Sequence, residues 1–174
     1  MRLLKLLLAG FIGLMVFILL LSTLFPSNPS VRRSILISGQ PVDTIMKCLH
    51  DLRSWPSWHP VFSSAGGATD LQVSADKLSC TIRGKPLEIS RVEANNRSVE
   101  VVISSPGENP INCHLSCDVI TGFREVRVEW LAIHHLSWYP WHKFYAIFLD
   151  QLAGPGYEAA LAGLRDYCIT GRIH

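Results

Sequence analysis

The amino-terminal segment constrains this chain most, because Leu6–Leu21 (LLLAGFIGLMVFILLL) contains no polar side chain. An apolar run of roughly 20 residues can cross the hydrocarbon core of a bilayer as one helix. The alternative is a cleaved signal peptide, whose apolar region usually runs about 7 to 15 residues and ends in a small-x-small site. The run here is longer, and its exit at Leu24-Phe25-Pro26 lacks that site. The sequence therefore predicts a transmembrane anchor over residues 1–25.

Charges on both sides of the apolar run bear on its orientation. Arg2 and Lys5 precede it, and Arg32 and Arg33 follow closely. Positive charges favour the cytoplasmic side, and the first flank usually dominates. We therefore expect a single-pass protein with its amino terminus in the cytoplasm and the rest of the chain on the far side.

After the anchor, residues 26–30 (PSNPS) are typical of a linker, and residues 31–174 have the length of one domain. The formal net charge of +2 is small and dispersed, which argues against nucleic acid as a partner. The five cysteines form no paired C-x-x-C pattern, and their odd number leaves at least one thiol unpaired within the chain. We expect neither a metal site nor a cofactor.

The segment after the linker is predicted to be mostly β-structure. Val31–Ser38 alternates like a strand, and Pro41 opens a helix whose apolar stripe extends to Leu52. A shorter helix or turn follows through Trp55 and Trp58. Turn-rich segments separate the later strands, so we expect an antiparallel meander. These strands are Ala68–Val73, Lys77–Ile82, Leu87–Val92, Ser98–Ile103, Ile111–Ile120 and Arg124–His134.

One face of the predicted sheet is apolar and needs a cover. The alternation places Leu115 and Trp130 on this face and Glu129 on the opposite one. A carboxy-terminal helix is predicted as the cover, with an apolar stripe formed by Tyr157, Leu161, Leu164 and Cys168. Trp141–Leu152 also has helical spacing and is interpreted as a separate helix, so that Pro155 would open the final one.

Residues 51–60 (DLRSWPSWHP) follow the pattern D-L-x-x-W-x-x-W-x-P, and residues 154–167 are GPGYEAALAGLRDY. These two stretches resemble the SRPBCC superfamily, which includes START-like lipid-transfer domains and polyketide cyclase/dehydrase-type proteins. The second stretch is similar to the motif G-x-x-[FY]-E-x-G-L-x-x-L-K of that family, with Ala160 replacing a glycine. The resemblance covers about residues 31–170. It implies an α+β helix-grip fold. In this fold, a curved antiparallel sheet of about seven strands wraps around a long C-terminal helix, and an apolar cavity lies between the sheet and the helix. The membrane anchor is an addition to that fold.

Because of this resemblance, we expect the chain to bind an apolar small molecule, such as a lipid, a quinone or a polyketide-like compound. The alternative is that the same side chains simply fill a small core and leave no cavity for a ligand. The candidate pocket residues are Trp55, Trp58, His59, Phe62, Val101, Leu115, Val128, Trp130, His134 and Phe148. The short linker would hold the domain near membrane lipids. We therefore expect the entrance to face the bilayer, beside Trp55, Trp58, Trp138 or Trp141.

Two other functions stay open. A cyclase- or hydrolase-like enzyme would use His59, His134 or His135 as an acid or base. The chain has no G-x-S-x-G, H-E-x-x-H or phosphate-loop motif, so no catalytic residue is assigned. A protein-interaction module of a membrane complex would use the aromatic segment Ser137–His142 to bind a protein partner.

Overall fold

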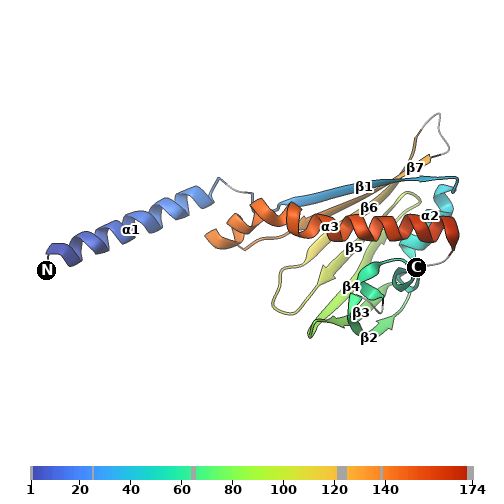
Figure 1. Cartoon of the computed structure of the whole chain (residues 1–174), viewed down its shortest axis with the longest axis horizontal. Helices are drawn as coiled ribbons and strands as arrows, with labels where there is room; N and C mark the ends of the chain where they lie inside the picture. The colour runs from blue at the N-terminus through green and yellow to red at the C-terminus, as the bar shows by residue number, and fades with distance from the viewer. Residues whose placement is uncertain (1, 25, 64–65, 121–124, 138, 172–174) are drawn as a thin grey trace.

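A long amino-terminal helix extends away from an α+β domain and touches it at the end of the helix (Figure 1). Helix α1 (Arg2–Ser22) is long and apolar enough to span a membrane, although a signal sequence has the same properties. The side chains from Lys5 to Ser22 are almost all exposed, so the described part of the domain provides little apolar cover for them. The computed structural model describes residues 2–24, 26–63, 66–120, 125–137 and 139–171, with side chains described from Lys5 onward.

The domain is built on one seven-stranded antiparallel sheet with the strand order β1-β7-β6-β5-β4-β3-β2. The predicted meander is confirmed, since β2 to β7 pair in chain order and β1 returns to pair with β7. The strands are β1 (Ser30–Ser38), β2 (Ala68–Val73), β3 (Lys77–Ile82), β4 (Lys85–Ala94), β5 (Ser98–Ser104), β6 (Ile111–Ile120) and β7 (Glu125–His134).

The predicted inner face of the sheet is also confirmed by the register. Val99, Leu115 and Trp130 stand side by side on β5, β6 and β7, and all three are buried. Glu129 lies on the opposite face and forms an ion pair with Arg32, with 3.4 Å between Nη1 and Oε1. The alternation therefore separates a packed side from a wet side, as the sequence indicates.

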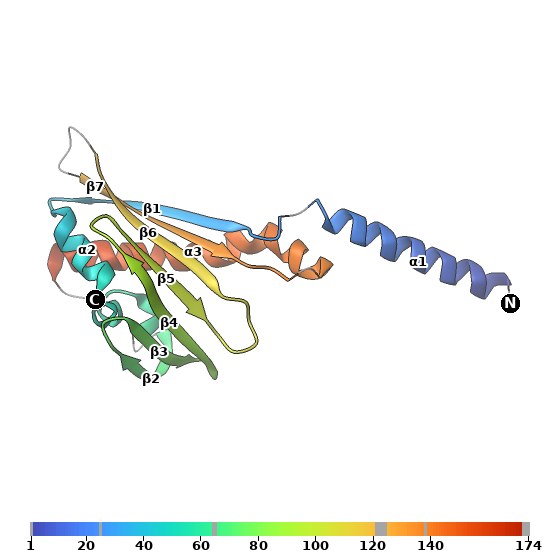
Figure 2. The ribbon, with the colours of Figure 1, turned by 180° about the vertical axis from the view of Figure 1, so that it is seen from behind.

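A single helix, α3 (Pro140–Thr170), covers the inner face, and Figure 2 shows the strands in front with α3 behind them. The prediction of a separate helix for residues 141–152 is wrong, because α3 continues through Pro155. Proline in a helix ordinarily costs about 3 kcal/mol, since it removes one hydrogen bond. Arg33 binds both sides of this weak point, with Nη1 2.8 Å from Asp150 Oδ1 and Nε 2.6 Å from Glu158 Oε1.

Three short helices close the end of the inner face that lies away from α1: α2 (Val42–His50), η1 (Leu52–Ser57) and η2 (Pro60–Phe62). The apolar stripe of α2 is buried, while its polar side chains face outward. Gly163 of α3 permits close packing here, because a β-carbon at this position would collide with the carbonyl oxygen of Trp58. The core is thus concentrated in the half of the domain distant from α1.

Candidate functional site

An aromatic cluster fills the middle of the inner face. The ring centroids of Trp55 lie 5.1 Å from Trp58 and 5.8 Å from Trp130. The imidazole of His59 is parallel to Trp55 at 6.1 Å, and Tyr157 of α3 lies 5.3 Å from Trp130. These contacts join η1, η2, β7 and α3. The cluster therefore fills the space between the sheet and α3 and extends to the end of the domain that lies away from α1.

Polar atoms inside this cluster are incompletely paired. Trp55 Nε1 donates to the carbonyl oxygen of Leu49 at 3.2 Å. The indole N–H groups of Trp58 and Trp130, by contrast, are buried without an acceptor among the described residues. A buried donor that lacks a partner costs about 1–3 kcal/mol. An oxygen atom that reached either indole would recover part of this free energy.

His59 serves a structural purpose in the cluster. Its Nδ1 accepts a hydrogen bond from the Val61 backbone N–H at 3.3 Å, which caps η2. Burial lowers the pKa of His59 to about 4, so the imidazole is neutral at physiological pH. It therefore lacks the near-neutral pKa that suits a general acid or base.

The structure places the ten predicted pocket residues in different environments. Seven are buried in the core, and His59 packs among them. His134 is half-buried at the end of β7, whereas Phe148 is exposed on α3. The buried seven are Trp55, Trp58, Phe62, Val101, Leu115, Val128 and Trp130. That this core set lines a ligand pocket stays a prediction.

A groove of about 680 Å³ opens at the other end of the inner face, next to α1. Its walls are the β5–β6 loop, the segment after β7 and the first turns of α3. Ile111 and His134 are register partners at this end of the sheet. We call this feature the α1-side groove, and its lining residues are Gly107, Glu108, Asn109, Ile111, His134, His135, Leu136, Ser137, Trp141, His142 and Tyr145.

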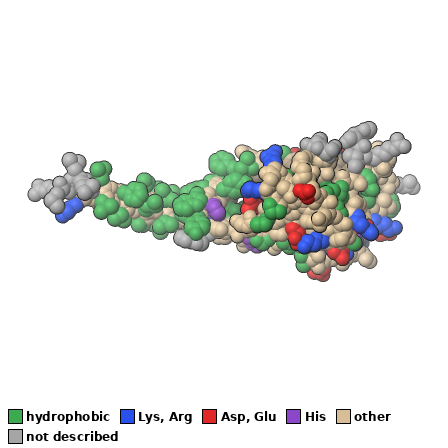
Figure 3. All heavy atoms as spheres, turned by 90° about the horizontal axis from the view of Figure 1, so that it is seen from below, with side chains coloured by type: hydrophobic (Ala, Val, Ile, Leu, Met, Phe, Trp, Pro, Cys, Tyr) green, Lys and Arg blue, Asp and Glu red, His purple; other side chains and the backbone are tan. Residues whose placement is uncertain are grey.

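Backbone hydrogen bonds hold the segment after α1 against this groove. Leu136 N–H donates to Ser27 O at 2.9 Å, and His134 N–H donates to Pro29 O at 3.0 Å. Helix α1 also contacts α3, and Figure 1 shows the end of α1 beside the beginning of α3. Figure 3 shows the apolar surface of α1 reaching this end of the domain. The groove is therefore located where α1 meets the domain.

His135 is fixed in place by side chains from three parts of the chain. Its Nδ1 lies 3.0 Å from Asn28 Oδ1, and its Nε2 lies 3.1 Å from Asn112 Nδ2. A neutral imidazole satisfies both contacts, donating through Nδ1 and accepting through Nε2. Asn109 Nδ2 donates to the backbone oxygen of His135 at 2.8 Å. These bonds tie the β5–β6 loop and the linker to one wall of the groove.

His134 turns toward α3, where its Nε2 lies 3.4 Å from the hydroxyl oxygen of Tyr157. Burial is the main cause that lowers the pKa of His134, and the nearby His135 lowers it further. Burial also raises the pKa of Tyr157 above its usual value. Both side chains are therefore neutral at physiological pH, and they form a polar pair at the inner edge of a wall that combines apolar and polar side chains.

An exposed apolar stripe runs from the groove along α3. Its members are separated by four, three and four positions, which places them on one helix face. Trp141 is 63% exposed, Tyr145 46%, Phe148 55% and Leu152 61%. Trp141 and Tyr145 also line the groove. A contiguous apolar surface of this kind is typical of a protein, ligand or membrane contact.

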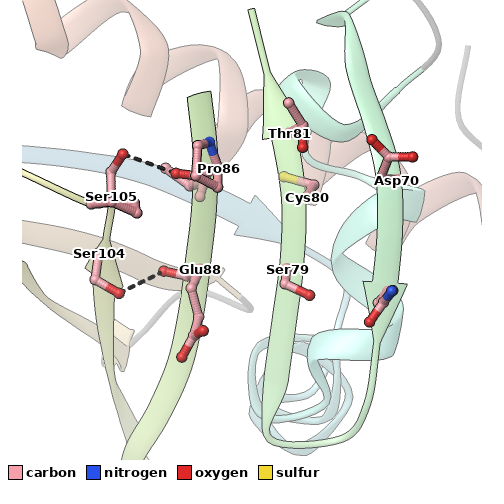
Figure 4. Close-up of a pocket in the computed structure, with 11 residues that line it drawn as sticks. Asp70, Ser79, Cys80, Thr81, Pro86, Glu88, Ser104 and Ser105 are labelled. Carbon is pink, nitrogen blue, oxygen red and sulfur yellow. Dashed lines mark hydrogen bonds between the residues drawn. The ribbon is translucent and has the colours of Figure 1, made fainter. Parts of the chain in front are cut away.

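A second groove, of about 480 Å³, lies on the outer face of the sheet over β2 to β5 (Figure 4). Its polar groups include the carboxylates of Asp70 and Glu88. The hydroxyls of Ser104 and Ser105 donate to backbone oxygens of β4, at 3.5 and 2.9 Å. Several of its polar groups are already bonded within the sheet, and its lining residues belong to neither α1 nor the apolar stripe of α3, which adjoin the α1-side groove.

Sequence reasoning did not identify most of the groove. The spacing of Trp141, Tyr145, Phe148 and Leu152 was a usable signal for a common helix face. Asn28, Asn109 and Asn112 gave no such signal, since their contacts with His135 join distant parts of the chain. Trp138, which was expected near an entrance, lies outside the described residues.

Solved structures with the same architecture share little sequence with this chain. A START superfamily protein from Mycobacterium smegmatis has a TM-score of 0.58 at 13% identity, and the match covers 81% of this chain and 97% of that protein. A Thermobifida fusca protein has a TM-score of 0.58 at 20% identity, covering 83% of this chain and 97% of its own. DynU16, from the dynemicin biosynthetic locus, has a TM-score of 0.57 at 14% identity, covering 83% of this chain and 49% of DynU16.

No protein-family model and no curated protein matches the sequence. The similarity to solved structures shows the fold, and the predicted α+β helix-grip class is confirmed.

Proposed function

We propose that this chain is a membrane-anchored protein that takes an apolar small molecule from the bilayer into the α1-side groove. Lipids, quinones and polyketide-like molecules belong to this class. The observation that carries the proposal is the coincidence of three features at one end of the domain. The groove, the exposed apolar stripe of α3 and the junction with the apolar helix α1 all lie there.

The dimensions of the groove support this function. Small-molecule sites usually enclose about 300–1,000 Å³ and have mostly apolar walls with a few polar groups. The α1-side groove, at about 680 Å³, is within this range. Ile111, Leu136, Trp141 and Tyr145 supply apolar or aromatic surface. The polar lining residues are Glu108, Asn109, His134, His135, Ser137 and His142.

The connection to α1 supports delivery from the bilayer. Residues 23–29 separate α1 from β1, and an extended chain of this length reaches roughly 25 Å at most. Ser27 and Pro29 are hydrogen-bonded to the segment at the end of β7, which shortens the free connection further. If α1 spans the membrane, the groove stays close to the lipid headgroups, and the stripe on α3 offers an apolar path toward it.

The fold is compatible with this function, although fold alone does not determine function. One structural neighbour is named as a START superfamily protein, and another belongs to the dynemicin biosynthetic locus. A catalytic function has less support, since burial lowers the pKa values of His59 and His134.

Mass spectrometry of organic extracts tests the proposal. The full-length protein would be purified in mild detergent and compared with a mock preparation and two arginine variants. Ile111→Arg places a charge in the groove, while Leu36→Arg makes the same kind of change at an exposed position of β1. We expect an apolar molecule to be enriched with the wild type and Leu36→Arg, and lost with Ile111→Arg. No enriched molecule, or equal enrichment in all three proteins, would contradict the proposal.

A further inference from the structure

We propose that the α1-side groove selects ligands whose polar head is an uncharged hydroxyl or carbonyl group, and that His134 is the residue that bonds this head. This inference rests on the proposed function and adds the chemical class of the ligand. It depends on the contacts of His134 and on the charges of the groove walls.

The position of His134 is fixed by its strand and by α3. As the register partner of Ile111, it lies at the open end of the inner face. Its Nε2 is 3.4 Å from Tyr157 Oη, and the Tyr157 ring packs against Trp130 at 5.3 Å. The imidazole is thus held between the aromatic cluster and the groove.

The other ring nitrogen, Nδ1, has no hydrogen-bond partner among the described residues. If Tyr157 donates its proton to Nε2, then Nδ1 carries the imidazole proton and can donate to a carbonyl oxygen. If Nε2 donates to Tyr157 instead, Nδ1 is an acceptor for a hydroxyl group. Each tautomer of the neutral imidazole therefore complements an uncharged oxygen group.

The charges around the groove disfavour an ionised head. Among its described lining residues, Glu108 is the only Asp, Glu, Lys or Arg, and its carboxylate already binds Lys85 Nζ at 2.7 Å. Arg33, on the nearby β1, is bonded by Asp150 and Glu158. A carboxylate or phosphate in the groove would therefore lose hydration without gaining an unpaired cation.

A set of probes with the same hydrocarbon chain isolates the head group. Binding of decane, decanol, methyl decanoate, decanoate and decylamine would be measured by equilibrium partition into lipid nanodiscs that carry the full-length protein, with partition into empty nanodiscs subtracted. The pH is set so that decanoate is ionised and decylamine protonated. We expect decanol and methyl decanoate to bind about 3- to 10-fold more tightly than decane, which corresponds to one net hydrogen bond. Decanoate and decylamine should bind more weakly than decane.

Variants then assign the preference to His134. His134→Phe keeps an aromatic ring and should reduce decanol and methyl decanoate to the affinity of decane, with decane binding retained. Tyr157→Phe should weaken the same preference, because Tyr157 positions the imidazole. His114→Phe is the matched control, since His114 lies on the outer face of β6 beside Glu100 and should leave the preference unchanged.

The outcomes separate this inference from the function on which it rests. If decanoate binds as tightly as decanol, or if His134→Phe and Tyr157→Phe both keep the full preference, the head-group assignment is overturned while apolar binding stands. If no probe binds, decane included, the binding function fails and the assignment fails with it.

Discussion

Arg33 lies directly over Gly154, in the space that a β-carbon on Gly154 would occupy. From this position its guanidinium reaches Asp150 on one side of Pro155 and Glu158 on the other. The missing side chain at residue 154 therefore allows β1 to clamp α3 where the helix is weakest. This clamp lies near the middle of α3, and the apolar stripe begins about three turns earlier in the helix.

We predict that Gly154→Ala is less stabilising than an alanine at an unobstructed helix position, because the new methyl group displaces the Arg33 guanidinium from its exposed ion pairs and so offsets the gain in helix propensity. Gly156→Ala is the matched control, since its β-carbon would meet nothing within 4 Å. That change should stabilise the helix by about 0.5–1 kcal/mol. Thermal unfolding of the full-length protein in detergent measures both. Similar stabilisation by the two variants would show that Arg33 does not lie over Gly154.

Acid should destabilise the domain through His59. Its pKa is about 4 in the folded state and 6.5 in the unfolded state, so folding favours the neutral imidazole. The free energy of unfolding is therefore unaffected by the titration of His59 above about pH 6.5, and it decreases as the pH falls from about 6.5 toward 4. Within that window the expected slope is about 1.4 kcal/mol per pH unit.

The measurement compares the free energy of unfolding at several pH values for the wild type and His59→Asn. Asparagine retains an acceptor that can cap η2 but does not titrate. The difference between the two proteins isolates His59 from His134, whose pKa is also lowered. Parallel pH profiles would contradict the assignment.

Cys48 should be the most reactive thiol among the cysteines. A hydrogen bond from Cys168 lowers the pKa of Cys48, whereas burial raises those of Cys113 and Cys117 to about 11 and about 12. Iodoacetamide should therefore modify Cys48 first, with a rate that rises at a lower pH than the rates of Cys113 and Cys117. Cys168→Ala should shift this profile toward higher pH. Earlier modification of Cys113 or Cys117, mapped by peptide mass spectrometry, would contradict the prediction.

Trp141 should contact lipid in the full-length protein. It is exposed at the end of the domain that adjoins α1, whereas Trp55 and Trp58 are buried in the cluster. In vesicles that contain brominated lipids, we expect quenching of tryptophan emission that disappears in Trp141→Phe and persists in Trp58→Phe. Equal quenching in the wild type and Trp141→Phe would place this end of the domain away from the bilayer.

Local sequence rules predicted the sheet well because its two faces have different surroundings. Along β5, β6 and β7, apolar residues such as Val99, Leu115 and Trp130 alternate with polar ones, and this alternation determines which face each side chain occupies. A shift of one residue in the register would bury the polar side chains. The same rules failed at Pro155. The helix continues through this proline, and Arg33, which is distant in the chain, forms ion pairs with α3 on both sides of it.

The candidate site was harder to predict, since it depends on contacts between distant residues. The end of β7 and its inner face could be read from the alternation, which is why His134 was a reasonable candidate. The bond between His135 and Asn28 spans 107 positions and has no periodic pattern. Aromatic residue type does not distinguish buried from exposed positions. Trp55, Trp58 and Phe148 are all candidate pocket residues by sequence, but the structure buries the first two and exposes the third.

Photolabelling with an alkyl diazirine tests most directly whether the α1-side groove holds an apolar molecule. The full-length protein in nanodiscs would be labelled with and without excess decanol, and the modified peptides mapped by mass spectrometry. We predict competed labelling of residues 107–111 and 134–145, absent in Ile111→Arg and present in Leu36→Arg. Labelling confined to α1, or competed labelling around Ser79 and Glu88 on the outer face, would contradict the account.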